Sequence, residues 1–225
     1  EMMPAYIGAY RYDKALRLLD KSSQADSAPG HYWRGRVFLG RNELDEAVSC
    51  FSKSINRDTT FAAAYRYRAN AFKEMGDLQA ALTDYTTLLA LQPDALFYNR
   101  RGIVYEELGQ FANAQDDYTK AIELNPKNGS YYNELAWCYR DSNQPQKAIE
   151  SFNKAEEVEP GFGYAYSNLG DLYQRLKQPE NAVAAYQKAL EIRPDNYDVY
   201  GFRYPSYMEL NNFVQAKADI EEYSK

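Results

Sequence analysis

The chain has 225 residues, of which 26% are charged, and its formal net charge is −6. The negative charge argues against nonspecific binding to nucleic acid or to anionic lipid, because both are polyanions. No apolar run approaches the length that crosses a bilayer, so we expect no membrane insertion. The first residue is not methionine, which suggests a trimmed start, and no signal-peptide pattern follows it. We expect a cytoplasmic protein.

The dominant pattern is a repeat of about 34 residues. An alanine recurs at intervals of 34, 33, 34, 34 and 34 residues, at Ala47, Ala81, Ala114, Ala148, Ala182 and Ala216. An apolar anchor lies four residues after each alanine, at Phe51, Tyr85, Tyr118, Phe152, Tyr186 and Ile220. A small residue lies twelve residues before the first five, at Gly35, Ala69, Gly102, Ala136 and Gly170. A fixed period of this length is typical of stacked helical repeats that share one continuous core.

The chain opens with an incomplete copy of the pattern. Tyr6, Ala15 and Leu19 keep the spacing, but Met3 stands where a small residue belongs. We therefore expect residues 1–27 to form a partial repeat.

Each complete copy predicts two antiparallel helices joined by a short turn, as residues 163–196 illustrate. Gly170 and Tyr173 lie on one helical stripe, and Tyr186 lies on a second. Pro194 then stops the second helix. The small Gly170 should let the two helices approach closely, while the tyrosine rings fill the space between neighbouring layers.

The last copy departs from the pattern. Tyr204 replaces the small residue, and Pro205 removes a backbone donor and clashes with the carbonyl of Gly201. We expect a kink or a late start in that helix. The closing segment, 213–224, should be a capping helix with its polar face outward. Its apolar face comprises Phe213, Ala216, Ile220 and Tyr223. Its polar face comprises Gln215, Lys217, Asp219, Glu221 and Glu222.

Over nearly its whole length the chain resembles the tetratricopeptide repeat (TPR) family. The resemblance implies an all-α fold, an α-solenoid of tandem helix-turn-helix repeats that forms a right-handed superhelix. The predicted complete repeats are 28–61, 62–94, 95–128, 129–162 and 163–196. The partial repeat 1–27 precedes them, and a degenerate C-terminal repeat with the capping helix follows at 197–225. We expect one continuous solenoid.

No pattern in the sequence points to catalysis. The single histidine, His31, falls where the family pattern has a large side chain, which favours a packing role. No CxxC, HExxH, Walker A or GxGxxG motif occurs. Cys50 and Cys138 lie more than two repeats apart, which favours buried free thiols over a disulfide. We predict that the protein is not an enzyme and needs no metal and no cofactor.

The resemblance also implies a ligand groove on the concave face, lined by the first helix of each repeat. Inward positions on such a helix follow the i, i+3, i+4, i+7 rule. A groove on the order of 50 Å would hold roughly 10 to 15 residues of extended peptide. The candidate peptide-binding residues are Trp33, Arg36, Arg66, Tyr67, Asn70, Asn99, Arg100, Asn133, Trp137, Arg140 and Asn168.

The chemistry of these residues predicts the kind of ligand. Arginines concentrate in the first half, at Arg36, Arg66 and Arg100, and would attract acidic side chains. The asparagine amides can pair with an extended backbone without reading its sequence. Trp33 and Trp137 offer aromatic anchors. We predict a protein–protein interaction scaffold that binds an extended, partly acidic segment of another protein.

Two other functions remain open at this stage. The chain could be a structural subunit that assembles, or self-associates, through its end repeats or convex face, because Tyr204 and Pro205 leave a layer incompletely covered. It could also be the regulatory arm of a larger enzyme.

Overall fold

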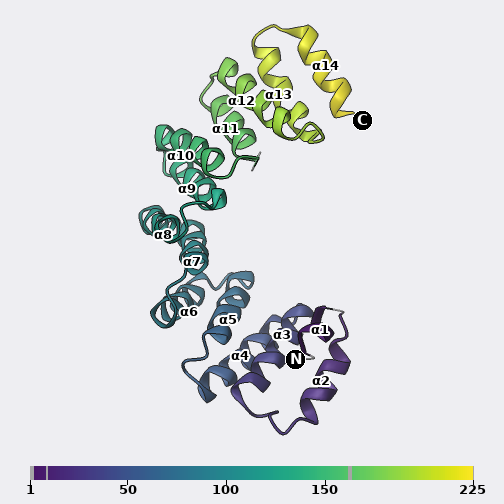
Figure 1. The fold of residues 1–225 in the computed structure, drawn as a ribbon, viewed down its shortest axis with the longest axis vertical. Helices are drawn as coiled ribbons and strands as arrows, with labels where there is room; N and C mark the ends of the chain where they lie inside the picture. Colours follow the sequence, from purple (N-terminus) through teal and green to yellow (C-terminus); the bar gives the residue numbers. More distant parts are fainter. Residues whose placement is uncertain (1–2, 9, 162–163, 225) are drawn as a thin grey trace. The chain divides into compact units, whose positions relative to one another are not determined.

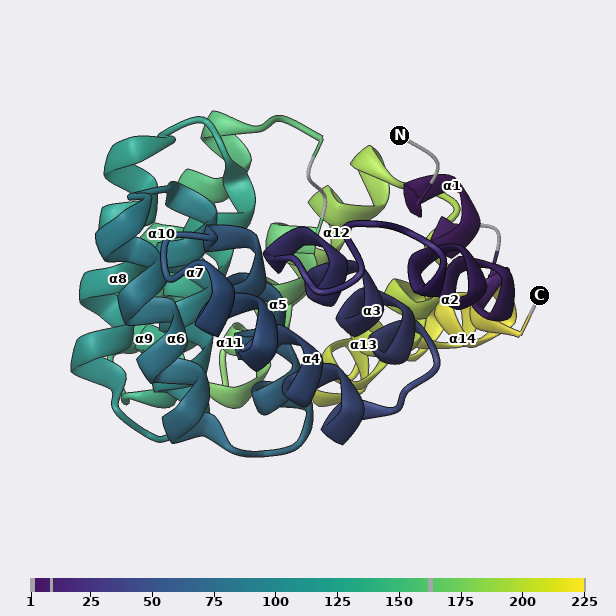
Figure 2. The same cartoon turned by 90° about the horizontal axis from the view of Figure 1, so that it is seen from below.

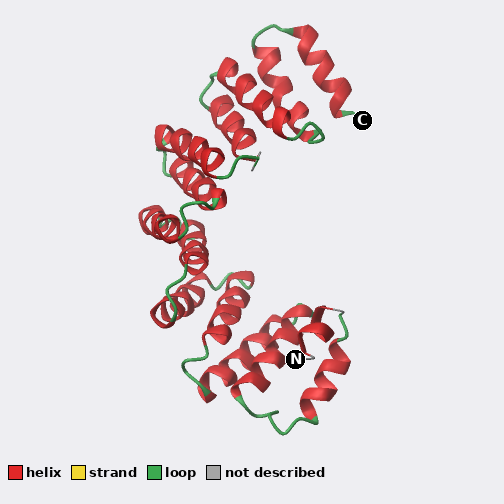
Figure 3. Ribbon diagram, in the orientation of Figure 1, coloured by secondary structure: helices red, strands yellow, loops and turns green. Residues whose placement is uncertain are grey.

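The computed structural model describes residues 3–8, 10–161 and 164–224, and every regular element in those ranges is an α-helix (Figures 1 and 3). The helices group into two compact units, Glu1–Gln110 and Phe111–Lys225. The side chain of Tyr6 and the whole of Gly163, where the fifth complete repeat was predicted to start, lie outside the described residues. No described helix is long and apolar enough to span a bilayer.

In the first unit, helices that follow one another along the chain pack side by side (Figure 2). The pair α3–α4 packs together, as does α5–α6, and α4 also packs on α5 and α6 on α7. The helices are α1 (Met3–Gly8), α2 (Tyr12–Asp20), α3 (Ala28–Gly40), α4 (Leu44–Arg57), α5 (Ala62–Glu74), α6 (Leu78–Leu91) and α7 (Ala95–Glu107).

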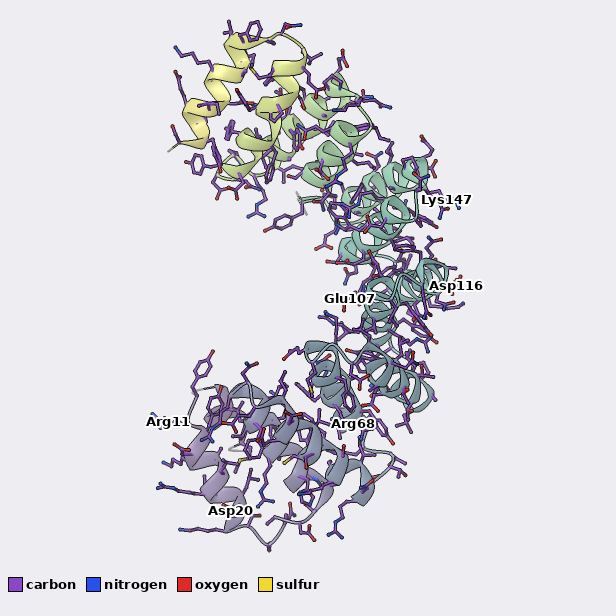
Figure 4. The ribbon with its side chains drawn as sticks, turned by 180° about the vertical axis from the view of Figure 1, so that it is seen from behind. Arg11, Asp20, Arg68, Glu107, Asp116 and Lys147 are labelled. Carbon is purple, nitrogen blue, oxygen red and sulfur yellow. The ribbon has the colours of Figure 1, made fainter. Side chains whose placement is uncertain are left out.

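The second unit repeats this arrangement. The pairs are α9–α10, α11–α12 and α13–α14, and each second helix also packs on the first helix of the next pair. Asp116 on α8 and Lys147 on α10 project from the side formed by the second helices (Figure 4). The helices are α8 (Phe111–Leu124), α9 (Gly129–Asp141), α10 (Pro145–Val158), α11 (Tyr164–Arg175), α12 (Pro179–Ile192), α13 (Asp198–Glu209) and α14 (Phe213–Tyr223).

The turn inside each helix pair holds one residue in the left-handed backbone region, always at the same place in the repeat. These residues are Tyr10, Asn42, Gly76, Gly109, Asn143, Lys177 and Asn211. Glycine adopts this conformation at no steric cost, and asparagine tolerates it. Tyr10, with φ at 55°, and Lys177, with φ at 58°, are the large side chains in the series.

The predicted core positions are confirmed in the copies that have a following repeat. Their anchors, Phe51, Tyr85, Tyr118, Phe152 and Tyr186, are at most 1% exposed. Gly170 packs as predicted, because a Cβ added there would lie 2.5 Å from the ring of Tyr186.

Both cysteines are free and buried, as predicted. Burial raises the pKa of the Cys50 thiol, which lowers its reactivity. His31 is only partly buried, and its Nε2 lies 2.9 Å from Oδ1 of Asp26. A second contact to that carboxylate comes from Arg57.

Of the two outcomes expected for the helix that contains Pro205, the late start does not occur, because α13 begins at Asp198 and continues through Pro205. The apolar face of α14 was expected to be covered, yet Phe213, Ile220 and Tyr223 are all exposed.

Asp219 explains part of this reversal. It was placed on the outward face, but it is buried against α13. There it accepts two hydrogen bonds from Arg203, at 3.0 Å from Nε and 2.7 Å from Nη2. A buried carboxylate requires such a partner, and the pair fixes which face of α14 turns toward α13.

Candidate functional site

Two guanidinium groups stack on a single tyrosine ring in the first unit. The Cζ of Arg36 lies 4.1 Å from the ring centroid of Tyr67, and the Cζ of Arg66 lies 4.5 Å from it. Arg36 comes from α3, while Arg66 and Tyr67 are neighbours on α5, which contacts α3. A cation over an aromatic face gains about 0.5–2 kcal/mol. We call Trp33, Arg36, Arg66 and Tyr67 the Tyr67 cluster.

Tyr32 fixes Arg36 within the cluster. The Nη1 of Arg36 donates a hydrogen bond to the Tyr32 hydroxyl at 3.1 Å. Burial raises the pKa of Tyr32, and the nearby charge of Arg36 opposes that shift. The ring of Trp33 packs edge-on against Tyr32 with centroids 5.0 Å apart, and Trp33 remains half-buried. The cluster therefore joins an aromatic surface to an ordered positive charge.

The arginines of this unit divide into two sets. Arg34 and Arg68 (labelled in Figure 4) each pair with a carboxylate of the same unit, with closest N–O distances of 2.7 Å. In the described part of the chain, no carboxylate pairs with Arg36, Arg66 or Arg100. The helices α3, α5 and α7 therefore carry three arginines that form no ion pair within the described residues.

Amide groups lie beside these arginines. The Tyr85 hydroxyl donates to Oδ1 of Asn70 at 2.5 Å. Burial raises the pKa of Tyr85 to about 12, although the charges of Arg100 and Arg66 oppose it, so the hydroxyl remains a donor at neutral pH. Asn99 is buried, and its Nδ2 finds no hydrogen-bond partner among the described residues. An unsatisfied buried donor costs about 1–3 kcal/mol.

The second unit presents a different surface on α9 and α11. Nδ2 of Asn168 donates to Oδ1 of Asn133 at 2.7 Å, which links the two helices. The guanidinium of Arg140 stacks 3.8 Å from the ring centroid of Trp137. Unlike the arginines of the Tyr67 cluster, Arg140 has acidic neighbours, with Asp141 at 2.6 Å and Asp171 at 4.0 Å.

The candidate residues predicted from the sequence are thus placed in two units. The first unit holds Trp33, Arg36, Arg66, Tyr67, Asn70, Asn99 and Arg100, and the second holds Asn133, Trp137, Arg140 and Asn168. Asn99 and Asn133 are buried, whereas the others are partly or fully exposed.

Sequence reasoning missed the hydroxyl of Tyr85, which extends from a fully buried ring to the side chain of Asn70. The available signal was the alternation of tyrosine and phenylalanine at the anchor position, since Phe51 and Phe152 occupy the same place without a hydroxyl.

The described residues contain no group of three His, Cys, Asp or Glu side chains that could hold a metal ion. The arrangement is suited to binding through charge, stacking and amide hydrogen bonds.

Two family models, each described as a tetratricopeptide repeat, match the chain. One matches residues 95–128 and 163–196, and the other matches residues 117–150. No curated protein sequence matches significantly.

Solved structures share the fold. The C-terminal part of a TPR repeat-containing protein from Cytophaga hutchinsonii is 16% identical with a TM-score of 0.79, covering 98% of this chain and 92% of that one. YrrB, described as a TPR protein with an unusual peptide-binding site, is 22% identical with a TM-score of 0.61, covering 84% and 95%.

A chain of the APC/C hetero-tetramer Cut9–Hcn1 is 22% identical with a TM-score of 0.66. That match covers 98% of this chain, which spans only 44% of the larger protein. At these identities the likeness concerns the fold alone. Together with the packed helix pairs, the matches confirm the predicted all-α solenoid of repeats. The chain therefore contains tetratricopeptide repeats, within residues 95–150 and 163–196, and its helix pairs have the all-α fold of TPR proteins.

Proposed function

We propose that the chain is a non-catalytic scaffold that binds an extended, partly acidic segment of another protein on the surface of α3, α5 and α7. The observation that carries the proposal is the stacking of Arg36 and Arg66 on one ring of Tyr67, with no carboxylate of the described chain pairing with either. YrrB, which shares the fold, is described as having a peptide-binding site.

The arginines supply the acidic preference. A ligand carboxylate would form charge-assisted hydrogen bonds with the guanidinium groups, and such bonds are about twice as strong as neutral ones. Because Tyr67 and Tyr32 already order the side chain of Arg36, less conformational entropy is lost on binding. Arg100, exposed on α7, adds a third cation to the same surface.

The remaining contacts would position the backbone and an apolar side chain of the ligand. Asn70 has its oxygen occupied by Tyr85 and keeps its amide donors for a peptide carbonyl. Asn99, whose unpaired Nδ2 is buried, would have to rotate its side chain outward to reach a peptide carbonyl. Trp33, half-buried beside Tyr32, would anchor an apolar residue.

The surface of α9 and α11 offers a second place for the same kind of backbone contact. Trp137 and Asn168 are both partly exposed there. Its charge differs, because Asp141 and Asp171 lie beside Arg140. We therefore assign the acidic preference to the first unit alone.

A binding titration tests the proposal. The probe is a fluorescein-labelled peptide of about 12 residues, rich in glutamate and leucine, sized to an extended segment along three helices. Replacing Arg66 and Arg100 together by alanine should weaken binding at least about tenfold, or 1.4 kcal/mol. The control variant, Arg41→Ala with Arg57→Ala, removes the same charge from other parts of the unit and should bind like the parent. Equal affinity of the two double variants would refute the assignment.

A further inference from the structure

In three repeats, an arginine on the first helix lies against two aromatic rings of the same helix. The Cζ atoms of these arginines lie 5.2–5.8 Å from the ring centroids. The triplets are Tyr65, Arg68 and Phe72; Tyr98, Arg101 and Tyr105; and Tyr200, Arg203 and Tyr207. Arg68 and Arg203 also pair with Asp84 and Asp219, each sixteen residues further along the chain. In these two repeats a guanidinium group fills the space beside the rings, and a buried carboxylate balances its charge.

The helices α9 and α11 keep both tyrosines of the triplet but carry leucine in place of the arginine. Their triplets are Tyr132, Leu135 and Tyr139, and Tyr166, Leu169 and Tyr173. Sixteen residues after each leucine stands Ser151 or Ala185, so the aspartate is replaced as well. A pocket of about 490 Å³ lies over the triplet of α9, and a pocket of about 150 Å³ lies over the triplet of α11. We call them the first groove and the second groove.

Both grooves border α10. Lys147 on α10 lines the first groove and projects from the side formed by the second helices (Figure 4). Asn153, also on α10, lines the second groove. Because packed helices lie about 8–10 Å apart, grooves on the two sides of one helix are about 10 Å apart. About three residues of an extended chain span that distance, at roughly 3.3 Å per residue.

The first groove is largely apolar, and its charges are balanced. The Nζ of Lys154 lies 2.7 Å from a carboxylate oxygen of Glu157. The Nζ of Lys147 lies 5.2 Å from the ring centroid of Tyr139, and Glu150 lines the same groove with the opposite charge. With two tyrosines and a leucine of α9 in its lining, the groove is suited to an apolar side chain.

The second groove carries a positive charge that no carboxylate balances. Lys188 lines it, is exposed, and has its Nζ 5.1 Å from the ring centroid of Tyr166. Within the described part of the chain Lys188 forms no ion pair. The exposed amides of Asn153 and Asn181 belong to the same lining. A ligand carboxylate would find a cation and amide donors here.

An arginine from a partner would not restore the missing contact. Arg68 and Arg203 each donate two hydrogen bonds to an aspartate. A cation that leaves water without such a partner is costly. The grooves have Ser151 and Ala185 in place of the aspartates, and lysines lie beside their rings. They therefore favour a ligand that is apolar in one part and acidic in another.

We propose that an extended segment of another protein crosses α10 on the side of the second helices. It places a phenylalanine or leucine side chain in the first groove and, three residues away, an aspartate or glutamate carboxylate beside Lys188 in the second. This surface lies in the second unit and shares no residue with the arginine surface of the first unit.

The test uses fluorescein-labelled peptides of eight residues, in which one phenylalanine and one glutamate stand three residues apart among glycine and serine, in either order. At least one order should bind the whole chain, with NMR shift changes confined to α8–α12. Leu135→Arg with Ser151→Asp introduces the pair that fills this space in other repeats, without a net change of charge, and should weaken binding at least tenfold. Lys188→Glu should weaken it at least threefold. The control Lys53→Glu makes the same change at the same place in the first complete repeat and should have no effect.

Circular dichroism checks that each variant is folded, and Lys188→Glu alters only an exposed side chain. A peptide with lysine in place of glutamate should bind more weakly. Equal binding to the parent and to Leu135→Arg with Ser151→Asp would overturn the proposal, as would no binding of either peptide at millimolar concentration. A dimer in sedimentation that this double variant dissociates would also overturn it, because a second copy would then occupy the grooves. Arg66→Ala with Arg100→Ala should leave this binding intact, which separates the proposal from that for the first unit.

Discussion

Tyr85 links the core of a repeat to Asn70, a candidate ligand-binding residue, through one oxygen atom. Its ring is fully buried, in the place that phenylalanine takes at Phe51 and Phe152. Its hydroxyl reaches Asn70 on α5 and lies near Arg66 and Arg100. A hydrogen bond of this kind contributes about 0.5–1.5 kcal/mol to stability, so the oxygen serves both folding and the orientation of the amide.

This residue gives the protein a pH dependence at high pH. Burial raises the pKa of Tyr85 from 10.0 to about 12 in the folded chain. The folded state therefore holds the proton more tightly, and this contribution to stability is complete below pH 10 and is lost as the pH rises toward 12. Tyr85→Phe should lose less stability than the parent over that interval, by roughly 2 kcal/mol. Urea unfolding at pH 9 and 12 measures the difference, and parallel losses in both proteins would contradict the assignment.

The location of the Tyr67 cluster follows from the repeat, but its contacts do not. Helical periodicity places Trp33, Arg36, Arg66 and Tyr67 on inward positions of two successive first helices. Which cation lies over which ring depends on side-chain rotamers across two helices, and no spacing encodes that choice. Periodicity also failed to show that Asn99 is buried, because its position tolerates both a surface and an interior side chain.

The helix pairs are the part of the fold that the sequence specifies most directly. Small residues, anchors and turn residues recur at fixed positions, so each copy confirms the others. The left-handed turn residue is asparagine or glycine in every pair except at Tyr10 and Lys177. A long side chain in this region costs the folded state about 1–2 kcal/mol. Glycine removes this cost, but it gives the unfolded chain more conformational entropy, which offsets part of the gain.

Lys177→Gly should therefore stabilise the protein by about 0.5–1 kcal/mol. The substitution removes a contact of 3.7 Å between Lys177 and Glu209, but both side chains are exposed and the pair contributes little. Chemical denaturation of the two proteins measures the gain. Lys177→Ala keeps the backbone strain and should give no gain, so a similar rise in that variant would exclude the backbone explanation.

Ion pairs between the two helices of a repeat were not predicted. Arg68 with Asp84, and Arg203 with Asp219, are each separated by the same 16 residues. Both aspartates are buried, although Asp219 was assigned to the outward face of its helix. The constant separation was present in the sequence, but its meaning depends on how the two helices cross, and that angle is a property of the packed pair.

Across the whole chain, stability should be lowest where a repeat has only one neighbour. In a stacked array each repeat is stabilised by its own fold and by the interfaces on either side. Among the described residues, α13 packs on α12, while Phe213, Ile220 and Tyr223 of α14 are exposed. The expectation holds although the contacts divide the chain into two units, because the helices compared here all lie in the second unit.

Amide hydrogens of α14 should exchange faster than those of α10 and α12, which are covered by the helices that follow them. Hydrogen-exchange mass spectrometry at neutral pH measures this with peptides from each helix. Equal protection of α14 and α10 would mean that the second unit opens only as a whole.

The separation of the arginines into two sets has a consequence for evolution. Those paired with carboxylates, such as Arg34 and Arg68, hold parts of the fold together through ion pairs. Arg36, Arg66 and Arg100 contribute to no ion pair within the described residues, so under the proposed function substitutions there would alter recognition without breaking an ion pair. Lineages could therefore exchange one client for another by changing a few exposed cations, without first acquiring compensating mutations.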